Sequence, residues 1–283
     1  MRGVVAIRVL GASAAAAACA ASALLLSGVR GAQRGLSAGL PARAGILVPS
    51  SPREKLPFED RTVTSTNWSG YAVTSKRHGI KAVSGSFVVP KVGASHFGFA
   101  ATWAGIGGYR TSDLIQAGTG EDSNSNGVFG KQYFAWYELL PGSERPLHNC
   151  IEDSRCRVRP GDRIAVNIRN SSGDAWTISV VNSRGWHWSR HIRYYSSRSS
   201  AEWILEAPTV QSQTRLAGVG TVRFGPTSTY VSGGSRRGIA AGHPIRVVLK
   251  QFQVGKEATP SSLAADGQSF NDCAYHSGPC PRP

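Results

Sequence analysis

Short runs of hydrophobic residues, separated by turn-forming residues, follow one another from residue 66 almost to the C-terminus. Polar and apolar positions alternate within these runs, which is the period of a β-strand, and helical spacing nowhere persists beyond about two turns. Ten such runs favour an all-β fold, a β-sandwich or closed barrel with little helix. The predicted strands are 67–75, 81–90, 99–107, 113–118, 131–140, 162–170, 175–182, 201–208, 218–225 and 245–251.

The run AEWILEAP at 201–208 is unusual because two carboxylates interrupt an apolar strand. Side chains alternate between the two faces of a strand, so Glu202 and Glu206 share one face and Trp203 lies on the other. A solvated face is the simplest interpretation, since charged residues are rarely buried without a partner. A face that lines a cleft is the alternative.

Residues 1–32 predict a secretory signal peptide. Two arginines precede an uncharged apolar run at 10–26, and Gly31-Ala32 is a suitable cleavage site. The alternatives are a retained membrane anchor and a lipoprotein modified at Cys19, but the apolar run continues beyond this cysteine. The sequence therefore predicts a secreted, extracellular protein with no stable membrane association once the signal is removed.

Residues 33–64 differ from the rest in having little periodicity, four prolines and a charge cluster at 53–61. This composition indicates a linker or pro-segment that lies outside the core. The folded domain is then expected at 65–256, and a C-terminal tail at 257–283.

Four cysteines remain outside the signal, and an even number in a secreted chain predicts disulfides. Cys150 with Cys156 and Cys273 with Cys280 is the simplest of three possible pairings. A metal site is not expected, because neither spacing is Cys-x-x-Cys and the histidines are scattered.

The formal net charge of +15, from 32 Lys and Arg and 17 Asp and Glu residues, bears on partners and working pH. Binding to nucleic acid is not expected, because the arginines are spread over many segments without a basic helix or zinc-finger spacing. A scarcity of carboxylates suits a protein that works in acid, since fewer groups lose stabilising interactions on protonation. Attraction to an anionic cell wall is the alternative.

The usual catalytic motifs are absent: no Gly-x-Ser-x-Gly, His-Glu-x-x-His or aspartic-protease motif occurs. Polar residues within apolar strands remain as candidates, namely Gln116, Glu138 and Glu202. A carboxylate in a partly apolar groove can take a proton from water, and an amide can donate to an oxyanion, without any cofactor. Gly118 and Gly120 are expected to leave room for a ligand backbone beside Gln116.

Seven segments together resemble the glutamic peptidases, also called eqolisins. They are NWSGYAV (67–73), VSGSFVVP (83–90), TWAGIGG (102–108), LIQAGTG (114–120), FAWYELLP (134–141), GDRIAV (161–166) and AEWILEAP (201–208). The resemblance covers about 67–251. It implies a concanavalin-like sandwich of two antiparallel sheets and a secreted, cofactor-free acid endopeptidase made with a pro-segment.

The resemblance also implies roles for particular residues. Glu202 would be the general base that activates water, and Gln116 would stabilise the tetrahedral oxyanion. Trp103, Trp136 and Glu138 would line the substrate cleft. Glu206 is either a residue at the edge of the cleft or a solvated one, and solvation is the preferred expectation.

Two features depart from the family pattern. A family aspartate falls at Gly107 in WAGIGG, so its contribution to the site is missing, and this chain is basic whereas many members are acidic. Cleavage-site preference and pH optimum are therefore left open.

Two other functions are compatible with the sequence. A lectin-like module would bind polysaccharide through Trp103, Trp136, Trp186 and Trp188, and would have no use for a Gln116–Glu202 pair. A glycan hydrolase would use Glu138 and Glu202. The preferred interpretation is a monomeric peptidase that acts on polypeptides.

Overall fold

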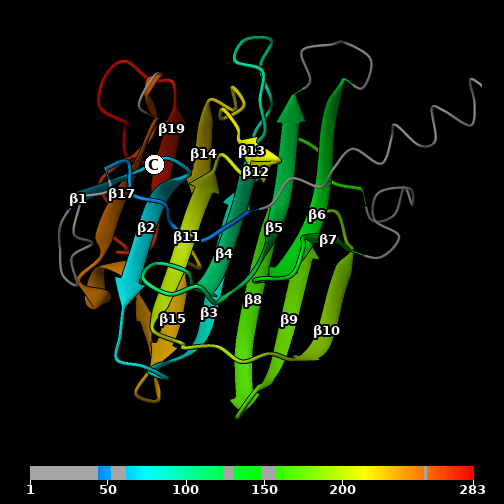
Figure 1. Ribbon diagram of the computed structural model, residues 1–283, viewed down its shortest axis with the longest axis vertical. Coiled ribbons are helices and arrows are strands. Elements are labelled where there is room, and N and C mark those ends of the chain that lie inside the picture. Colours follow the sequence, from blue (N-terminus) through cyan, green and yellow to red (C-terminus); the bar gives the residue numbers. More distant parts are fainter. Residues whose placement is uncertain (1–43, 52–61, 124–129, 148–156, 252–253) are drawn as a thin grey trace, which may run out of the picture. The chain divides into compact units, whose positions relative to one another are not determined.

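The computed structural model describes residues 44–51, 62–123, 130–147, 157–251 and 254–283. These residues are almost entirely β-structure (Figure 1), with one short 3₁₀ helix at Ile239–Gly242. None of their helices is long and apolar enough to cross a membrane. The prediction of an all-β fold with little helix is confirmed.

The strands form two layers. The first, called the front sheet because it faces the viewer in Figure 1, has β11 near its middle, between β2 and β4. In order across the sheet its strands are β1 (Thr62–Ser65), β17 (Ile245–Gln251), β2 (Trp68–Thr74), β11 (Ser200–Glu206), β4 (Ala101–Gly107), β5 (Leu114–Ser123), β6 (Lys131–Leu139) and β7 (Arg145–Pro146).

The second layer, the back sheet, has β3 (Ile80–Val88) at its centre. On one side of β3 lie β8 (Arg163–Ser172), β9 (Ala175–Asn182) and β10 (His187–Arg193). On the other side lie β15 (Thr229–Ser232) with β16 (Ser235–Gly238), and β14 (Thr221–Phe224) with β19 (Phe270–Ala274).

The two sheets are joined at one margin. Strand β18 (Gly255–Pro260) pairs with β17 of the front sheet and with β19 of the back sheet, so the ladder is continuous. All pairings are antiparallel except that of β1 with β17. A separate small hairpin consists of β12 (Thr209–Val210) and β13 (Ser212–Gln213).

The ten predicted strands are all present, with boundaries shifted by a few residues. The prediction missed β10, because HWSRHIR carries mostly polar residues that a strand exposes on one face. It also missed the short strands β15 and β16, which flank a turn.

The sequence predicted that the segments 33–64 and 257–283 lie outside the sandwich, but described parts of both belong to it. In the segment 33–64, Ala44 and Leu47 are fully or almost fully buried, and Thr62–Ser65 forms β1. In the tail 257–283, strands β18 and β19 complete the ladder between the sheets. These segments lack a clear sequence period because each contributes only a few residues to an existing sheet.

One predicted disulfide is present, between Cys273 and Cys280. It links the segment that follows β19 back to Cys273 of that strand. The other predicted pair, Cys150 with Cys156, lies outside the described residues.

The sheets pack through the inward face of β11. The Trp203 indole lies over Gly85 of β3, where an added Cβ would approach its Cδ1 to 2.9 Å. The same indole donates a hydrogen bond from Nε1 to the Ser84 carbonyl oxygen at 2.8 Å. A residue larger than glycine at position 85 would separate the two sheets at this point.

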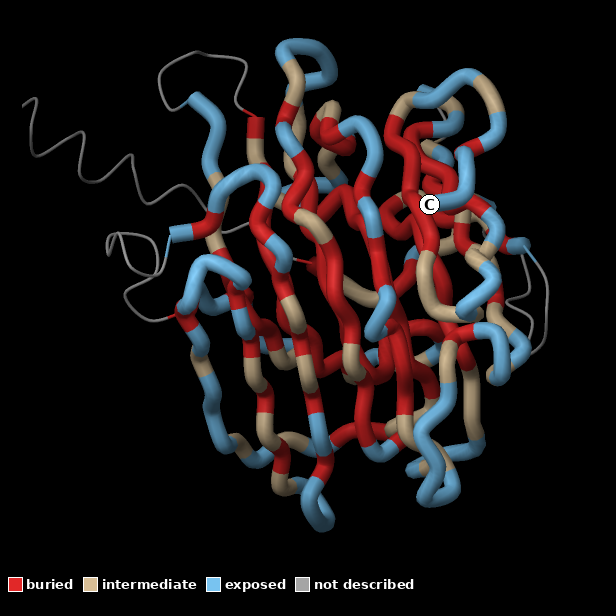
Figure 2. Tube along the Cα trace, turned by 180° about the vertical axis from the view of Figure 1, so that it is seen from behind, coloured by how far each residue is buried: buried red, intermediate tan, exposed pale blue. Residues whose placement is uncertain are grey.

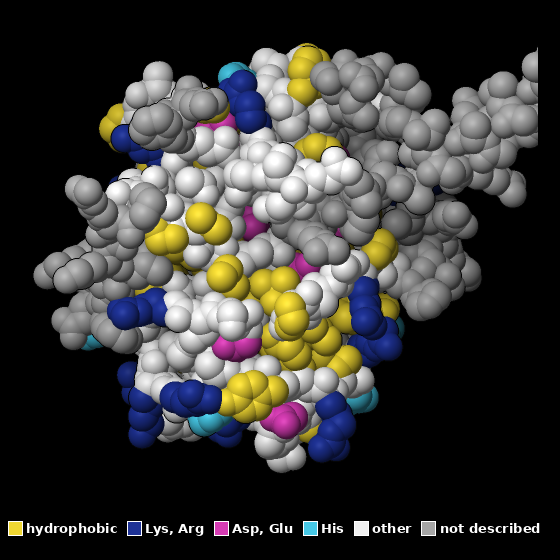
Figure 3. All heavy atoms as spheres, in the orientation of Figure 1, with side chains coloured by type: hydrophobic (Ala, Val, Ile, Leu, Met, Phe, Trp, Pro, Cys, Tyr) yellow, Lys and Arg dark blue, Asp and Glu magenta, His cyan; other side chains and the backbone are white. Residues whose placement is uncertain are grey.

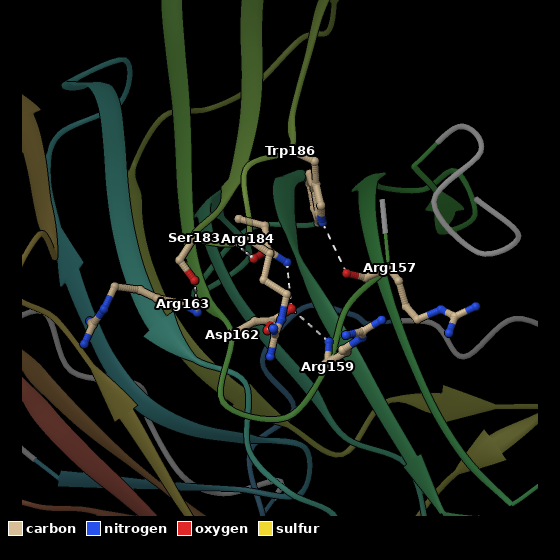
Figure 4. A network of polar contacts seen from close by, with 8 residues as sticks. Arg157, Arg159, Asp162, Arg163, Ser183, Arg184 and Trp186 are labelled. Carbon is tan, nitrogen blue, oxygen red and sulfur yellow. Dashed lines mark hydrogen bonds and ion pairs between the residues drawn. The ribbon is translucent and has the colours of Figure 1, made fainter. Parts of the chain in front are cut away.

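A buried carboxylate organises one end of the β8–β9 hairpin (Figure 4). Asp162 accepts hydrogen bonds from the Arg159 backbone N–H at 3.0 Å and the Asn182 amide at 2.9 Å, and it pairs with Arg184. The backbone N–H of Arg163 donates to the Ser183 hydroxyl nearby at 3.0 Å. This pairing compensates the buried charge of Asp162.

Several other buried carboxyls have a raised pKa, because burial disfavours their charged form. Burial raises the pKa of Asp122 and of Asp272 to about 7. The folded protein therefore binds protons that the unfolded chain releases above about pH 4. Stability from these groups is complete below that pH and is lost as the pH rises towards 7.

Asp272 offers a direct test of this linkage. Asp272→Asn should flatten the fall in unfolding free energy between pH 4 and 7, because a neutral amide cannot release the proton. The expected difference is up to about 1.4 kcal/mol for each pH unit in that interval. Urea unfolding at pH 4, 5.5 and 7 measures it, with exposed Asp174→Asn as the control. Equal slopes in wild type and Asp272→Asn would contradict the assignment.

Candidate active site

Three candidate residues lie in one row across the front sheet. Glu202 of β11 is opposite Gly105 of β4, Gly105 is opposite Gln116 of β5, and Gln116 is opposite Glu138 of β6. Directly opposed residues of antiparallel strands point to the same side of a sheet. The four residues therefore share the face that is turned away from the back sheet.

Gly105 is the residue that lies between the two proposed catalytic residues in this row. Neighbouring strands are about 4.8 Å apart, so the backbones of Glu202 and Gln116 are roughly 10 Å apart. A Cβ on Gly105 would lie 3.1 Å from the Gln116 Cβ and 2.9 Å from the Trp103 ring. Gly105 therefore places no side chain of its own in the row between Glu202 and Gln116, and the edge of the Trp103 ring lies over its backbone.

The amide of Gln116 is held by Glu138. Its Nε2 donates to Glu138 Oε2 at 2.8 Å, and both side chains are fully buried. The Gln116 carbonyl oxygen has no hydrogen-bond partner among the described residues. An amide carries two N–H donors, so one donor and the acceptor are left for a ligand.

Glu202 is buried in an environment that disfavours its charge. Its carboxyl makes no hydrogen bond of good geometry with described residues, although the nearby Ser200 hydroxyl slightly favours the charged form. Burial, assisted by the negative charge of Asp113, raises the pKa of Glu202 well above its usual range. Glu202 therefore keeps its proton to a higher pH than an exposed glutamate does.

Two tryptophans, Trp103 and Trp136, lie in the cross-strand row next to this one. In the neighbouring cross-strand row Ile204 is opposite Trp103, followed by Gly118 and Trp136. Both tryptophans are fully buried, and Trp103 packs edge-to-face on Trp68 at a centroid distance of 5.0 Å. The two predicted cleft tryptophans thus share the face of Gln116 and Glu202.

The expectation that two glycines leave room for a ligand is wrong. A Cβ on Gly120 would lie 2.4 Å from the Phe134 ring, and one on Gly118 would lie 2.6 Å from the Trp103 Cβ. Protein side chains already occupy this space, so these glycines serve packing.

Glu206 is not solvated, contrary to the expectation from the sequence. It is 1% exposed and accepts hydrogen bonds from the Gly45 N–H at 2.8 Å, Asn67 Nδ2 at 3.1 Å and Trp103 Nε1 at 2.9 Å. Burial raises its pKa well above the usual range. The even, four-residue spacing from Glu202 indicated this shared face, but the donors come from three distant segments.

The segment 44–51, blue in Figure 1, covers part of this face. Ala44 and Leu47 join the buried cluster that contains Trp103 and Trp136. The Gly45 carbonyl oxygen accepts a hydrogen bond from Trp68 Nε1 at 2.8 Å, and the Leu47 N–H donates to the Gly108 carbonyl at 3.1 Å. No sequence signal marked these residues as part of the site.

A carboxylate lies close to the place where the family aspartate is missing. A Cβ on Gly107 would lie 3.0 Å from Asp113 Oδ2. This oxygen accepts hydrogen bonds from the Ser197 N–H at 2.7 Å and from the Ser196 and Ser197 hydroxyls, each at 3.0 Å. Asp113 therefore anchors the segment that leads into β11.

Further carboxyls gather near the row. Glu144, which follows β6, is 6% exposed, and its pKa is raised well above the usual range by burial and by the neighbouring Glu138. Figure 3 shows acidic side chains among the hydrophobic ones at the centre of this view, with Lys and Arg towards its margins. The site is thus an acidic, largely apolar face.

Two tryptophans proposed for a lectin-like function lie elsewhere. Trp186 and Trp188 belong to the β9–β10 region, and both pack into the core between the sheets. Trp188 stacks on Tyr137 at a centroid distance of 5.2 Å. They do not form one surface with Trp103 and Trp136.

Sequence comparison relates this chain to known proteins. The model of the peptidase A4 family matches residues 66–269. Aspergillopepsin-2 of Aspergillus niger is 26% identical over 251 residues, which cover 77% of this chain and 82% of that protein.

Solved structures show the same fold. The crystal structure of scytalido-glutamic peptidase with a transition state analogue inhibitor has a TM-score of 0.58 and 18% identity, covering 74% of this chain and 98% of that chain. SCP-B, described as a member of the eqolisin family in complex with the tripeptide Ala-Ile-His, has a TM-score of 0.55 and 17% identity at the same coverage. The predicted β-sandwich is confirmed.

The hydrogen bonds of Glu206 give a prediction about stability. Glu206→Gln places an amide N–H against one of three buried donors, so unfolding free energy should fall by about 1–3 kcal/mol. Denaturant titration at pH 5 measures this loss. The exposed Asp174→Asn is the control. An unchanged midpoint would show that the Glu206 contacts contribute nothing.

Proposed function

The chain belongs to the peptidase A4 family and is a glutamic endopeptidase; from this premise we propose that Glu202 and Gln116 form its catalytic pair. The observation that carries the proposal is their position in one cross-strand row on either side of Gly105. A polypeptide strand that lies over Gly105 brings its carbonyl group between the carboxyl and the amide. The substrates are polypeptides, and the enzyme acts as a monomer without a cofactor.

The proposed reaction needs only these two groups. Ionised Glu202 takes a proton from water as the oxygen of that water bonds to the carbonyl carbon. The free N–H of Gln116 donates to the oxyanion that develops on the carbonyl oxygen. Glu202 then passes its proton to the leaving nitrogen as the C–N bond breaks, and the carboxyl is ionised again.

Glu138 acts through Gln116 as a positioning residue. Its Oε2 accepts the hydrogen bond from Gln116 Nε2 at 2.8 Å, so the nitrogen end of the amide is turned towards Glu138. The same bond holds Gln116 against rotation, and preorganised donors stabilise an oxyanion most strongly.

We further propose that residues 33–64 include a pro-segment and that 44–51 close the site until they are removed. Gly45 and Leu47 bond to groups on the face that a substrate would occupy. Removal would let water reach Glu202, and its pKa would fall because desolvation is the main cause of its elevation. Ionised Glu202 would then be available in acid.

The same proposal includes secretion through the signal peptide at 1–32. The buried carboxyls set an upper limit to the pH range in which the enzyme is active, since ionisation of Asp122 and Asp272 near pH 7 destabilises the fold. Activity is therefore expected in acid and is expected to decline as the pH approaches 7.

The catalytic pair is tested by substitution. Glu202→Gln and Gln116→Ala should each reduce hydrolysis of a denatured protein at pH 4 by about 10³-fold or more, while both variants remain folded at the assay temperature. Asp174→Asn, an exposed substitution, should retain wild-type turnover. Substantial turnover in Glu202→Gln would remove this residue from the mechanism.

The covering segment is tested with two neighbouring residues. Leu47 is 4% exposed in the apolar cluster, whereas Val48 is 44% exposed. Leu47→Asp should raise the initial rate of the uncleaved chain, because a charge cannot remain buried among apolar side chains. Val48→Asp should leave that rate unchanged. Equal initial rates for both variants and wild type would show that 44–51 do not restrict access.

A further inference from the structure

The outer side of the back sheet, turned away from the front sheet, carries a separate surface. Along β8 and β9 buried positions alternate with intermediate or exposed ones, and β10 has only intermediate and exposed positions, as Figure 2 shows from behind the molecule. The inward positions, among them Val166 and Ile168, belong to the core. The exposed charged or imidazole residues on the outer side are Arg163, Arg169, His187, His191, Arg193, Arg223 and Arg236.

All charge on this surface is positive. Strands β3, β8, β9, β10, β14, β15 and β16 contain no Asp or Glu. Among the described residues, ion pairs are formed by Arg184 with Asp162 and by Arg215 with Glu257, and neither involves the outer arginines. The buried acids of the site lie on the front sheet instead. The molecule therefore separates its charges between opposite sides.

The spacing of the arginines follows from the strand register. Arg223 and Arg163 stand in one cross-strand row with one strand between them, and Arg169 and His191 stand in another. The backbones of the two residues in each row are thus about 10 Å apart, and the two rows are about 20 Å apart along β8. Regularly spaced cations on a flat sheet suit a long polymer with repeated negative groups.

The side chains between these rows are small and polar. Ser84, Asn167, Ser179 and Ser189 form one continuous cross-strand row. Such hydroxyl and amide groups can exchange hydrogen bonds with sugar hydroxyls. No Phe, Tyr or Trp side chain stands on the outer side of these described strands to stack on nucleotide bases. The one strongly exposed large apolar residue on the outer side of these described strands is Val181. A single valine offers too little apolar surface to insert into a lipid layer.

We propose that this outer side, the basic face, binds an acidic polysaccharide. Charge complementarity supplies the attraction, and the central polar row contacts the sugar hydroxyls. Because the basic face lies on the opposite side of the molecule from Gln116 and Glu202, the polymer can be bound without covering the site. The binding does not depend on the proposed catalytic pair.

Dextran sulfate is the probe, with uncharged dextran of the same length beside it. Binding of the whole chain to immobilised polymer is measured at pH 7 over a series of salt concentrations. The face variant is Arg169→Gln/Arg193→Gln/Arg223→Gln, and none of these side chains has a hydrogen-bond partner among the described residues. The matched control, Lys250→Gln/Lys256→Gln/Arg282→Gln, removes the same charge from exposed positions outside the face.

The face variant should bind dextran sulfate about tenfold or more weakly than wild type, with a salt slope lower by about one for each arginine that contacts the polymer. The control should stay within about twofold, and neither protein should bind uncharged dextran. Melting temperatures check folding, and Arg169→Gln/Arg193→Gln serves if the triple variant is unstable. The proposal fails if the control loses as much affinity, if wild type does not bind, or if double-stranded DNA binds as tightly through the same arginines.

Discussion

The packing of Trp203 against β3 determines the orientation of the strand on which the site depends. Its indole lies over Gly85 and donates to the Ser84 carbonyl, so only one face of β11 can point into the core. The opposite face must then carry Glu202 and Glu206, whatever the cost of burying two carboxyls. Flanking strands on both sides of β11 leave no freedom of register.

The burial of these carboxyls links folding to protonation. Burial in an apolar surrounding disfavours the charged form and raises the pKa of Glu202, Glu206 and Glu144 well above the usual range. Asp162 is the contrasting case, since Arg184 pairs with it directly. The preference for acid thus comes from where the acids lie, and not only from how few there are.

The same two sheets divide the charge of the molecule. The front sheet carries buried carboxyl groups surrounded by apolar residues. The outer side of the back sheet carries exposed arginines. A net charge of +15 could have been spread evenly over the surface. The register of β8 and β10 instead collects part of it on one flat face.

Alternation along the chain was enough to predict the ten main strands and the shared face of Glu202 and Glu206, because a strand's period is local. It also marked Gln116 and Glu138 as polar residues inside apolar strands. Distance between strands is not local, so only the tertiary structure placed Glu202 opposite Gln116 across Gly105 and hydrogen-bonded Gln116 to Glu138. It also decided that Glu206 is buried and that 44–51 cover the face, because the groups that bond to them are supplied by segments remote in sequence.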